Sequence, residues 1–320
     1  MKFFLFSTLV AAVALGQDSN SYTKSEVDIN GRRVTENSQI VSRTGKSASE
    51  VTEKSLSING REVPLEKVEE HVLRDDAGGK VVERLVKRYD PTGNPMQPTK
   101  QIIEEQKQPG GVSTIRQTTY EGDLNGRLQL SERAVTQKQS SGSTETAETV
   151  VERPTLNGSF EPVTRRSVVR VKDTNGYQES TTIYLRGENG DFRPTSKVTI
   201  DHTENGPRST ENAAEYEVGP LGELKLHTQK VQTTVKRPDG SQDVQLNVFG
   251  QNLAGRAGSM DSNKLTLQEQ DIIERKRVSG NAVVESFSLR RPTIADPNQL
   301  GPLQHVSDTT CRGKCEPDKP

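Results

Sequence analysis

The sequence predicts an all-β fold, an elongated antiparallel meander of about 16 strands built from about eight 32-residue two-strand repeats. Three observations predict this fold. Glycines recur at a nearly fixed interval, asparagine often precedes them, and β-branched residues fill the segments between them. Self-similarity with a period of roughly 20 to 50 residues is typical of repeat architectures.

One series of glycines sets the period. From Gly60 to Gly255 the successive intervals are 33, 33, 32, 32, 32 and 33 residues. A second series of glycines lies between these positions, so a turn residue occurs about every 16 residues. Asn-Gly pairs occur seven times, and both residue types tolerate the positive φ that a tight hairpin turn requires. The spacing therefore predicts an alternation of turns and strands.

The segments between the turns have the composition of strands. Residues 167–171 and 181–185 are rich in Val, Thr, Ile and Tyr, which favour strands. Two segments, 64–73 and 264–277, also fit helical spacing. Because they occupy the same repeat position as 167–171, we assign them as strands, with local helices as the alternative.

The repeat also sets the domain boundaries. Residues 1–16 contain Lys2 followed by an apolar run and small residues, which predicts a secretory signal peptide cleaved after Gly16. Residues 17–45 form a degenerate first repeat, 46–308 the β-hairpin repeat array and 309–320 a polar tail with the two cysteines. No later segment is long and apolar enough to form a transmembrane helix. We therefore expect a secreted or periplasmic protein.

The supply of apolar residues favours an open sheet. Hydrophobic residues make up 29% of the chain and aromatic residues 4%, and there is no Trp. An outer-membrane barrel requires a lipid-facing apolar band with aromatic girdles. The chain has six Tyr and seven Phe, and segments such as 104–107 and 164–167 place charges on both alternating sets. We therefore expect a long, thin sheet stabilised by its neighbouring strands.

The chain shows no pattern of an enzyme, a metal site or a cofactor site. The four histidines, His71, His202, His227 and His305, do not stand at metal-ligand spacing, so we expect them to be solvated strand residues. No nucleophile elbow, phosphate loop or metalloprotease helix occurs.

Two further side-chain features concern the exported state of the chain. Cys311 and Cys315 are expected to form a local disulfide in an oxidising compartment, with intermolecular pairing or free thiols as alternatives. In a eukaryotic host, Asn157 would be a glycosylation acceptor.

Three functional hypotheses follow. The first is an exported, non-catalytic β-repeat protein with a structural, adhesion or interaction role at or outside the cell surface, where its partner would be a protein or a cell-surface polymer. The 43 basic and 44 acidic residues nearly cancel, which gives no reason to expect nucleic-acid binding.

The second hypothesis is a periplasmic or extracellular carrier that shelters an apolar ligand in a curled sheet. It requires Val81, Ile115, Val168 and Ile183 to share one face of the sheet. The third hypothesis is an outer-membrane β-barrel.

Overall fold

The computed structural model describes residues 17–27, 33–43, 48–58, 61–123, 125–219, 221–251, 265–278, 282–293 and 299–312. The expected signal peptide (residues 1–16), Cys315 and most of the expected tail lie outside these ranges. The expected cleavage of the signal peptide and the disulfide therefore stay predictions.

Within the described residues all regular secondary structure is β-strand. The eighteen strands are β1 (Gln17–Val27), β2 (Arg33–Arg43), β3 (Ser49–Ile58), β4 (Arg61–Asp76), β5 (Gly79–Arg88), β6 (Thr99–Gln108), β7 (Val112–Gly122), β8 (Leu128–Ser141), β9 (Thr144–Pro154), β10 (Phe160–Lys172), β11 (Gly176–Arg186), β12 (Phe192–Asn205), β13 (Arg208–Val218), β14 (Leu224–Lys236), β15 (Gln242–Gln251), β16 (Leu265–Val278), β17 (Ala282–Arg290) and β18 (Gln304–Arg312).

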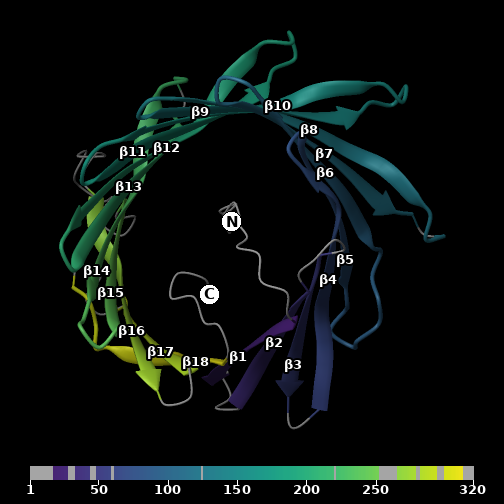
Figure 1. Ribbon diagram of the computed structural model, residues 1–320. Helices are drawn as coiled ribbons and strands as arrows, with labels where there is room; N and C mark the ends of the chain where they lie inside the picture. Colours follow the sequence, from purple (N-terminus) through teal and green to yellow (C-terminus); the bar gives the residue numbers. More distant parts are fainter. Residues whose placement is uncertain are drawn as a thin grey trace.

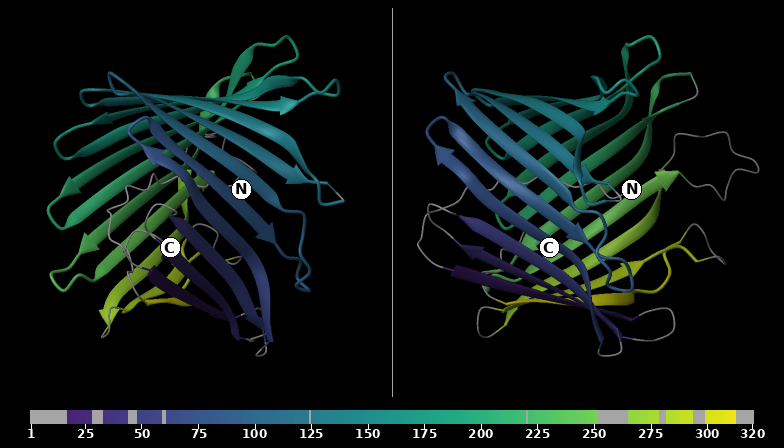
Figure 2. Two further views of the ribbon diagram at one scale, coloured as in Figure 1. Left: turned by 45° about the vertical axis from the view of Figure 1, so that its right-hand side comes forward. Right: turned by 90° about the vertical axis from the view of Figure 1, so that its right-hand side faces the viewer.

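The strands form one closed antiparallel meander. Each strand pairs with the next in sequence, and β1 also pairs with β18, from Ser21 opposite Arg312 to Glu26 opposite Ser307. Figure 1 shows the resulting ring of strands, and Figure 2 shows that the strands are inclined to the barrel axis. The chain is therefore an 18-stranded β-barrel.

The prediction of an elongated, open sheet is wrong in its closure, and the expected strand number of about 16 is two too low. An open meander would leave the backbone N–H and C=O groups of β1 and β18 unpaired along two edges, and closure pairs them with each other. The argument from apolar supply assumed that closure needs a filled core or a lipid coat. Barrels of 16 to 18 strands can instead leave an aqueous interior, so a low apolar content does not prevent closure.

The predicted turns are confirmed at most of the glycines. Six loops share one pattern, in which the first residue's N–H donates to the fifth residue's carbonyl and the fourth residue, a glycine, donates to the first residue's carbonyl. These glycines have φ between +76° and +91° and are Gly93, Gly126, Gly158, Gly190, Gly222 and Gly240. The left-handed conformation explains why glycine recurs there.

Gly176 differs from these turn glycines. It is the first residue of β11 and lies opposite Thr203 of β12. A Cβ at this position would lie 1.8 Å from the carbonyl oxygen of His202. Glycine is needed here for the close approach of two strands and not for a turn.

Strand is the correct assignment for both segments with helical spacing. Residues 64–73 lie within β4, and Leu265–Val278 forms β16. The alternative of local helices is therefore wrong for these segments. The final strand also extends to Arg312, so its last residues fall within the segment 309–320 expected to be a tail.

The barrel has very little dry interior. Among the described residues the buried apolar side chains are only Val68, Val244, Ala282 and Cys311, and none of the large side chains is fully buried. Hydrogen-bonded strand pairing and cross-strand side-chain contacts therefore hold the wall together. Most side chains on both faces are partly accessible to solvent.

Candidate functional site in the barrel lumen

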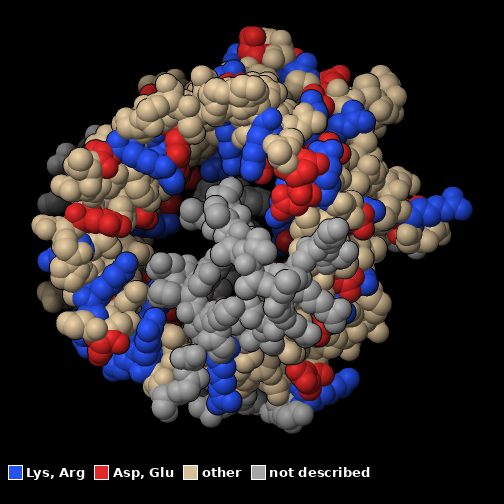
Figure 3. Space-filling model, viewed as in Figure 1, with Lys and Arg blue, Asp and Glu red and all other residues tan. Residues whose placement is uncertain are grey.

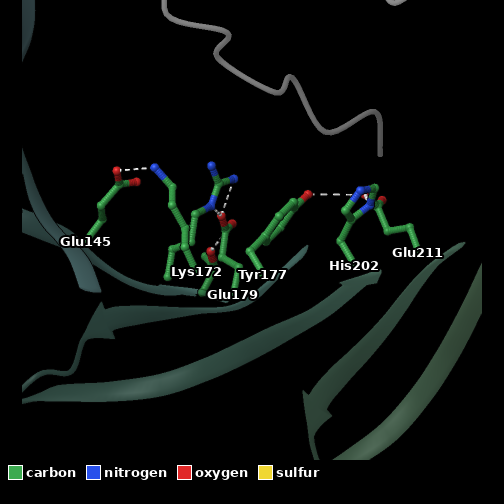
Figure 4. Close-up of polar contacts among 8 residues, drawn as sticks. Glu145, Lys172, Tyr177, Glu179, His202 and Glu211 are labelled. Atoms are coloured by element: carbon green, nitrogen blue, oxygen red, sulfur yellow. Dashed lines mark hydrogen bonds and ion pairs between the residues drawn. The ribbon is translucent and has the colours of Figure 1, made fainter. Parts of the chain in front are cut away.

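Register and the close-up view separate the inner wall from the outer wall. Figure 4 shows Glu145, Lys172, Tyr177, Glu179, His202 and Glu211 extending from the concave side of the sheet. Side chains alternate between the two faces along each strand, and directly opposed residues share a face. The printed register therefore assigns each strand residue to the lumen or to the outside.

The inner wall alternates ion pairs with small groups of apolar residues. Lumen-facing pairs occur on many strands and include Arg84–Glu70, Arg153–Glu132, Lys230–Glu215 and Arg275–Glu285. Val68, Val168 and Val198 lie between such pairs. Figure 3 shows basic and acidic side chains interspersed around the end of the barrel that faces the viewer. The lumen is therefore a polar surface with both signs of charge.

The most connected part of this surface is a network across β9 to β13. Lys172 Nζ lies 2.5 Å from Glu145 Oε1, which links β10 to β9. Arg170 donates to Glu179 Oε2 from Nε at 2.8 Å and approaches the same oxygen with a terminal nitrogen at 2.6 Å. Glu179 is only 14% exposed, so this pair is well shielded from water. Shielding of this kind makes the pair stronger than a surface ion pair.

The network continues through an aromatic stack. The guanidinium of Arg170 lies 4.5 Å from the centroid of the Tyr177 ring, and the Tyr177 and His202 rings stack with centroids 4.9 Å apart. The Tyr177 hydroxyl donates to Glu211 Oε2 at 3.3 Å, and His202 Nδ1 lies 3.6 Å from the same oxygen. Figure 4 shows these side chains side by side on one face. The arrangement fixes long polar side chains along the wall.

The 32-residue repeat accounts for part of this geometry. Arg170 and His202 occupy equivalent repeat positions, as do Glu179 and Glu211. Cross-strand pairing places Arg170 opposite Glu179 and His202 opposite Glu211. The same cation-carboxylate pair is therefore built twice, one repeat apart.

A second inner-wall cluster lines a hollow of about 150 Å³ on β3, β4 and β5. Lys54 Nζ lies 3.9 Å from Glu66, and Arg84 Nε lies 3.1 Å from Glu70. Its lining residues are Glu50, Thr52, Lys54, Glu66, Val68, Glu70 and Arg84. The hollow presents charge of both signs and suits a small hydrophilic solute.

The outer wall is polar too, especially over β3 to β6. Lys67 lies 2.9 Å from Glu53 and 3.2 Å from Glu69, and Lys87 lies 3.7 Å from Glu69. These residues alternate with the inner-wall residues of the same strands, so they face outward. Lys100 and Glu83, 2.6 Å apart, continue the charged sector onto β6. We call this set the outer ion network.

The histidines expected to be solvated lie in different surroundings. His202 is 18% exposed and belongs to the lumen network, so the expectation is wrong for this residue. His227 and His305 are about half exposed, and His71 lies on the outer face of β4. Within the described residues no group of three or more His, Cys, Asp or Glu side chains could hold a metal ion. Cys311 is buried in β18, while its expected partner Cys315 lies outside the described residues.

The shared apolar face that a carrier requires does not form. Ile115, Val168 and Ile183 face the lumen, but Val81 faces outward. Charged residues also alternate with the lumenal apolar ones. The hypothesis of an apolar-ligand carrier is therefore not supported by this wall.

Comparison with known proteins gives a likeness of fold and no sequence relative. No protein-family model and no curated protein matches the chain. The crystal structure of Pseudomonas aeruginosa OccK5 (OpdH) superposes with a TM-score of 0.54 at 8% identity, over 93% of this chain and 97% of that chain. The structure of OccK3 (OpdO) from the same organism gives a TM-score of 0.49 at 9% identity, over 92% and 93% of the two chains.

The chain shares a closed-barrel fold with OccK5. The closed 18-stranded barrel therefore fits the third hypothesis, the outer-membrane barrel, better than it fits an elongated structural element. No helix among the described residues is long and apolar enough to cross a membrane.

Proposed function

We propose that the chain is a hydrophilic channel of the cell envelope, a non-catalytic barrel of the outer-membrane type whose lumen passes small polar or charged solutes. One observation carries the proposal. The sheet closes through β1 and β18 around an inner wall lined with paired charges. OccK5, which shares the fold, belongs to outer-membrane channels, and this supports the same class for our chain.

The lumen chemistry supports a passage for solutes more than it supports tight binding. Paired Lys, Arg, Asp and Glu side chains leave no strong net field along the wall, so the channel would discriminate weakly between small anions and cations. The network from Glu145 to Glu211 would hold its side chains against the wall and keep the passage open. The proposal includes no cofactor and no reaction.

Reconstitution in planar lipid bilayers tests this proposal. We expect stepwise conductance from the purified protein. Lys230→Gln, which leaves Glu215 unpaired in the lumen, should shift the reversal potential toward cation selectivity. Lys276→Gln removes an equal charge from the outer face of β16 and should not shift it. Folded protein that produces no conductance would refute the channel.

The outer ion network favours a second candidate, a barrel that stands in water and has a structural or adhesion role. A Lys or Arg facing lipid near the bilayer midplane costs about 2–4 kcal/mol. Lys67, Lys87 and Lys100 all face outward, so lipid contact over this sector would cost an amount comparable with a typical folding free energy.

Detergent dependence separates the two candidates. A channel should aggregate or sediment with membranes in detergent-free buffer and should remain bound to them after a high-salt wash. A water-borne barrel should remain monodisperse without detergent. Neutralising the network with Lys67→Met and Glu69→Leu should improve membrane insertion in the first case and reduce solubility in the second.

A further inference from the structure

One end of the outer wall carries a belt of large apolar side chains. Tyr120, Tyr184, Tyr216 and Phe249 each stand two residues before the end of their strand, on β7, β11, β13 and β15. The first residues of the even-numbered strands complete the belt, and they are Leu128, Phe160, Phe192, Leu224 and Leu265. We call these nine residues the outer belt.

Register places the belt on the outer face and at one level. Tyr184 follows the lumenal Ile183, and Tyr216 follows the lumenal Glu215, so both rings face outward. Opposed pairs extend the belt sideways, with Val218 opposite Leu224 and Gln251 opposite Leu265. The belt therefore runs along ten consecutive strands, with β9 as the one strand that lacks a large apolar member.

Cations stand directly inside the belt at the same period. Lys100, Arg133, Arg165 and Lys197 are separated by 33, 32 and 32 residues. The Arg133 guanidinium lies 4.3 Å from the centroid of the Phe160 ring, and that of Arg165 lies 4.4 Å from the Tyr184 ring. Lys100 is opposite Tyr120, and Lys197 is opposite Tyr216. The repeat thus builds one unit several times, an outward ring with a cation above it.

Three of these four cations lack an anionic partner in the wall. Among the described residues no carboxylate forms an ion pair with Arg133, Arg165 or Lys197, and Arg165 Nε has no hydrogen-bond partner. The contrast with the outer ion network is clear, because there each Lys contacts at least one Glu. The cations of the belt therefore present unneutralised charge to whatever covers the rings.

We propose that the outer belt seats this end of the barrel in the headgroup region of an anionic lipid membrane. Tyr rings have an apolar body and a polar tip and favour the boundary between headgroups and acyl chains. Arg and Lys can extend along apolar surface and bind lipid phosphates with their charged ends. A single belt on an otherwise polar outer wall fits contact at one interface, and the inference does not depend on the lumen conducting solutes.

Vesicle binding tests the proposal, with phosphatidylcholine vesicles compared with vesicles that also contain phosphatidylglycerol. We expect the protein to co-float with the anionic vesicles. The triple variant Tyr184→Ser, Phe192→Ser, Tyr216→Ser should bind about tenfold more weakly or worse. The matched control Val169→Ser, Val171→Ser, Val235→Ser removes exposed outer-face residues away from the belt and should bind as the wild type does.

The cations have their own test. Arg133→Gln, Arg165→Gln and Lys197→Gln together should remove the preference for anionic vesicles, with a loss of about fivefold for each cation. Circular dichroism of each variant should show unchanged strand content. Because the chain has no Trp, its tyrosine fluorescence reports the contact, and brominated lipids should quench it in the wild type.

Two results would overturn the proposal. In the first, the belt variant binds anionic vesicles as tightly as the wild type and its control. In the second, the wild type self-associates in analytical ultracentrifugation and the belt variant does not, which would make a second copy of the chain the occupant of the belt. Loss of conductance with retained vesicle binding would refute the channel and leave the belt standing.

Discussion

Tyr177 of β11 and His202 of β12 lie directly opposite each other and stack in the lumen, with their ring planes 16° apart. On the far side of the Tyr177 ring lies the Arg170 guanidinium. Three side chains from three strands therefore form a continuous pile along the inner wall. The pile couples neighbouring strands through side chains in a barrel that has almost no buried core.

Removal of the Tyr177 ring should destabilise this part of the wall. Tyr177→Ala loses the stack on His202 and the cation contact of Arg170, at a cost of about 1–3 kcal/mol. Tyr177→Phe keeps the ring and loses only the hydrogen bond to Glu211, at a cost of about 0.5–1.5 kcal/mol. Urea unfolding measures both values. Equal losses for the two variants would show that the stack contributes nothing.

Two glycines should respond differently to the same substitution. Gly158→Ala places an L side chain at φ +79° with nothing within 4 Å, so the cost is backbone strain of about 1–2 kcal/mol. Gly176→Ala drives a Cβ into the His202 carbonyl and should cost at least about 3 kcal/mol. Thermal unfolding of both variants gives the order. A larger loss at Gly158 would contradict the close strand approach at β11.

Asp90 should keep the loop between β5 and β6 ordered in mild acid. Hydrogen bonds from the Thr92 hydroxyl and from the amide and side chain of Asn94 hold the pKa of Asp90 well below its usual value of 3.8. A depressed folded-state pKa contributes stability that is present above pH 3.8 and is lost as the pH falls below it.

The amide resonances of Thr92 and Asn94 should therefore hold constant from pH 7 down to about 4 and shift only at lower pH. Asp90→Asn should abolish the acid-dependent shift. A transition centred near pH 5 in the wild type would contradict the hydrogen-bonded turn.

The repeat could be read from the sequence because it is encoded locally. Gly126, Gly158 and Gly190 adopt the positive φ that their Asn-Gly pairs indicate. The assignment of β4 as a strand also followed from repeat equivalence, although its own residues fit helical spacing. Local turn chemistry and periodicity were sufficient for the antiparallel meander.

Closure could not be read in this way, because no local pattern marks β1 and β18 as partners. Their pairing depends on strand inclination and register summed over eighteen strands. The lumen network was missed because the histidines were searched only for metal-ligand spacing, whereas His202 is matched with Arg170 by the repeat.

The outer belt was missed for a different reason, since aromatic residues were counted and not placed in the repeat. Tyr184 and Tyr216 are 32 residues apart, and Arg165 and Lys197 have the same spacing. Alignment of the repeats by their turn glycines would have shown this signal.

The closure of β1 onto β18 is the central claim and can be measured directly. Thr23 and Thr310 lie opposite each other, so Thr23→Cys and Thr310→Cys together should form a disulfide within one chain upon oxidation, identified by tryptic mapping. In an open meander of eighteen strands these positions would lie about 80 Å apart. Quantitative cross-linking in the monomer is the predicted result, and cross-links formed only between chains would contradict the barrel.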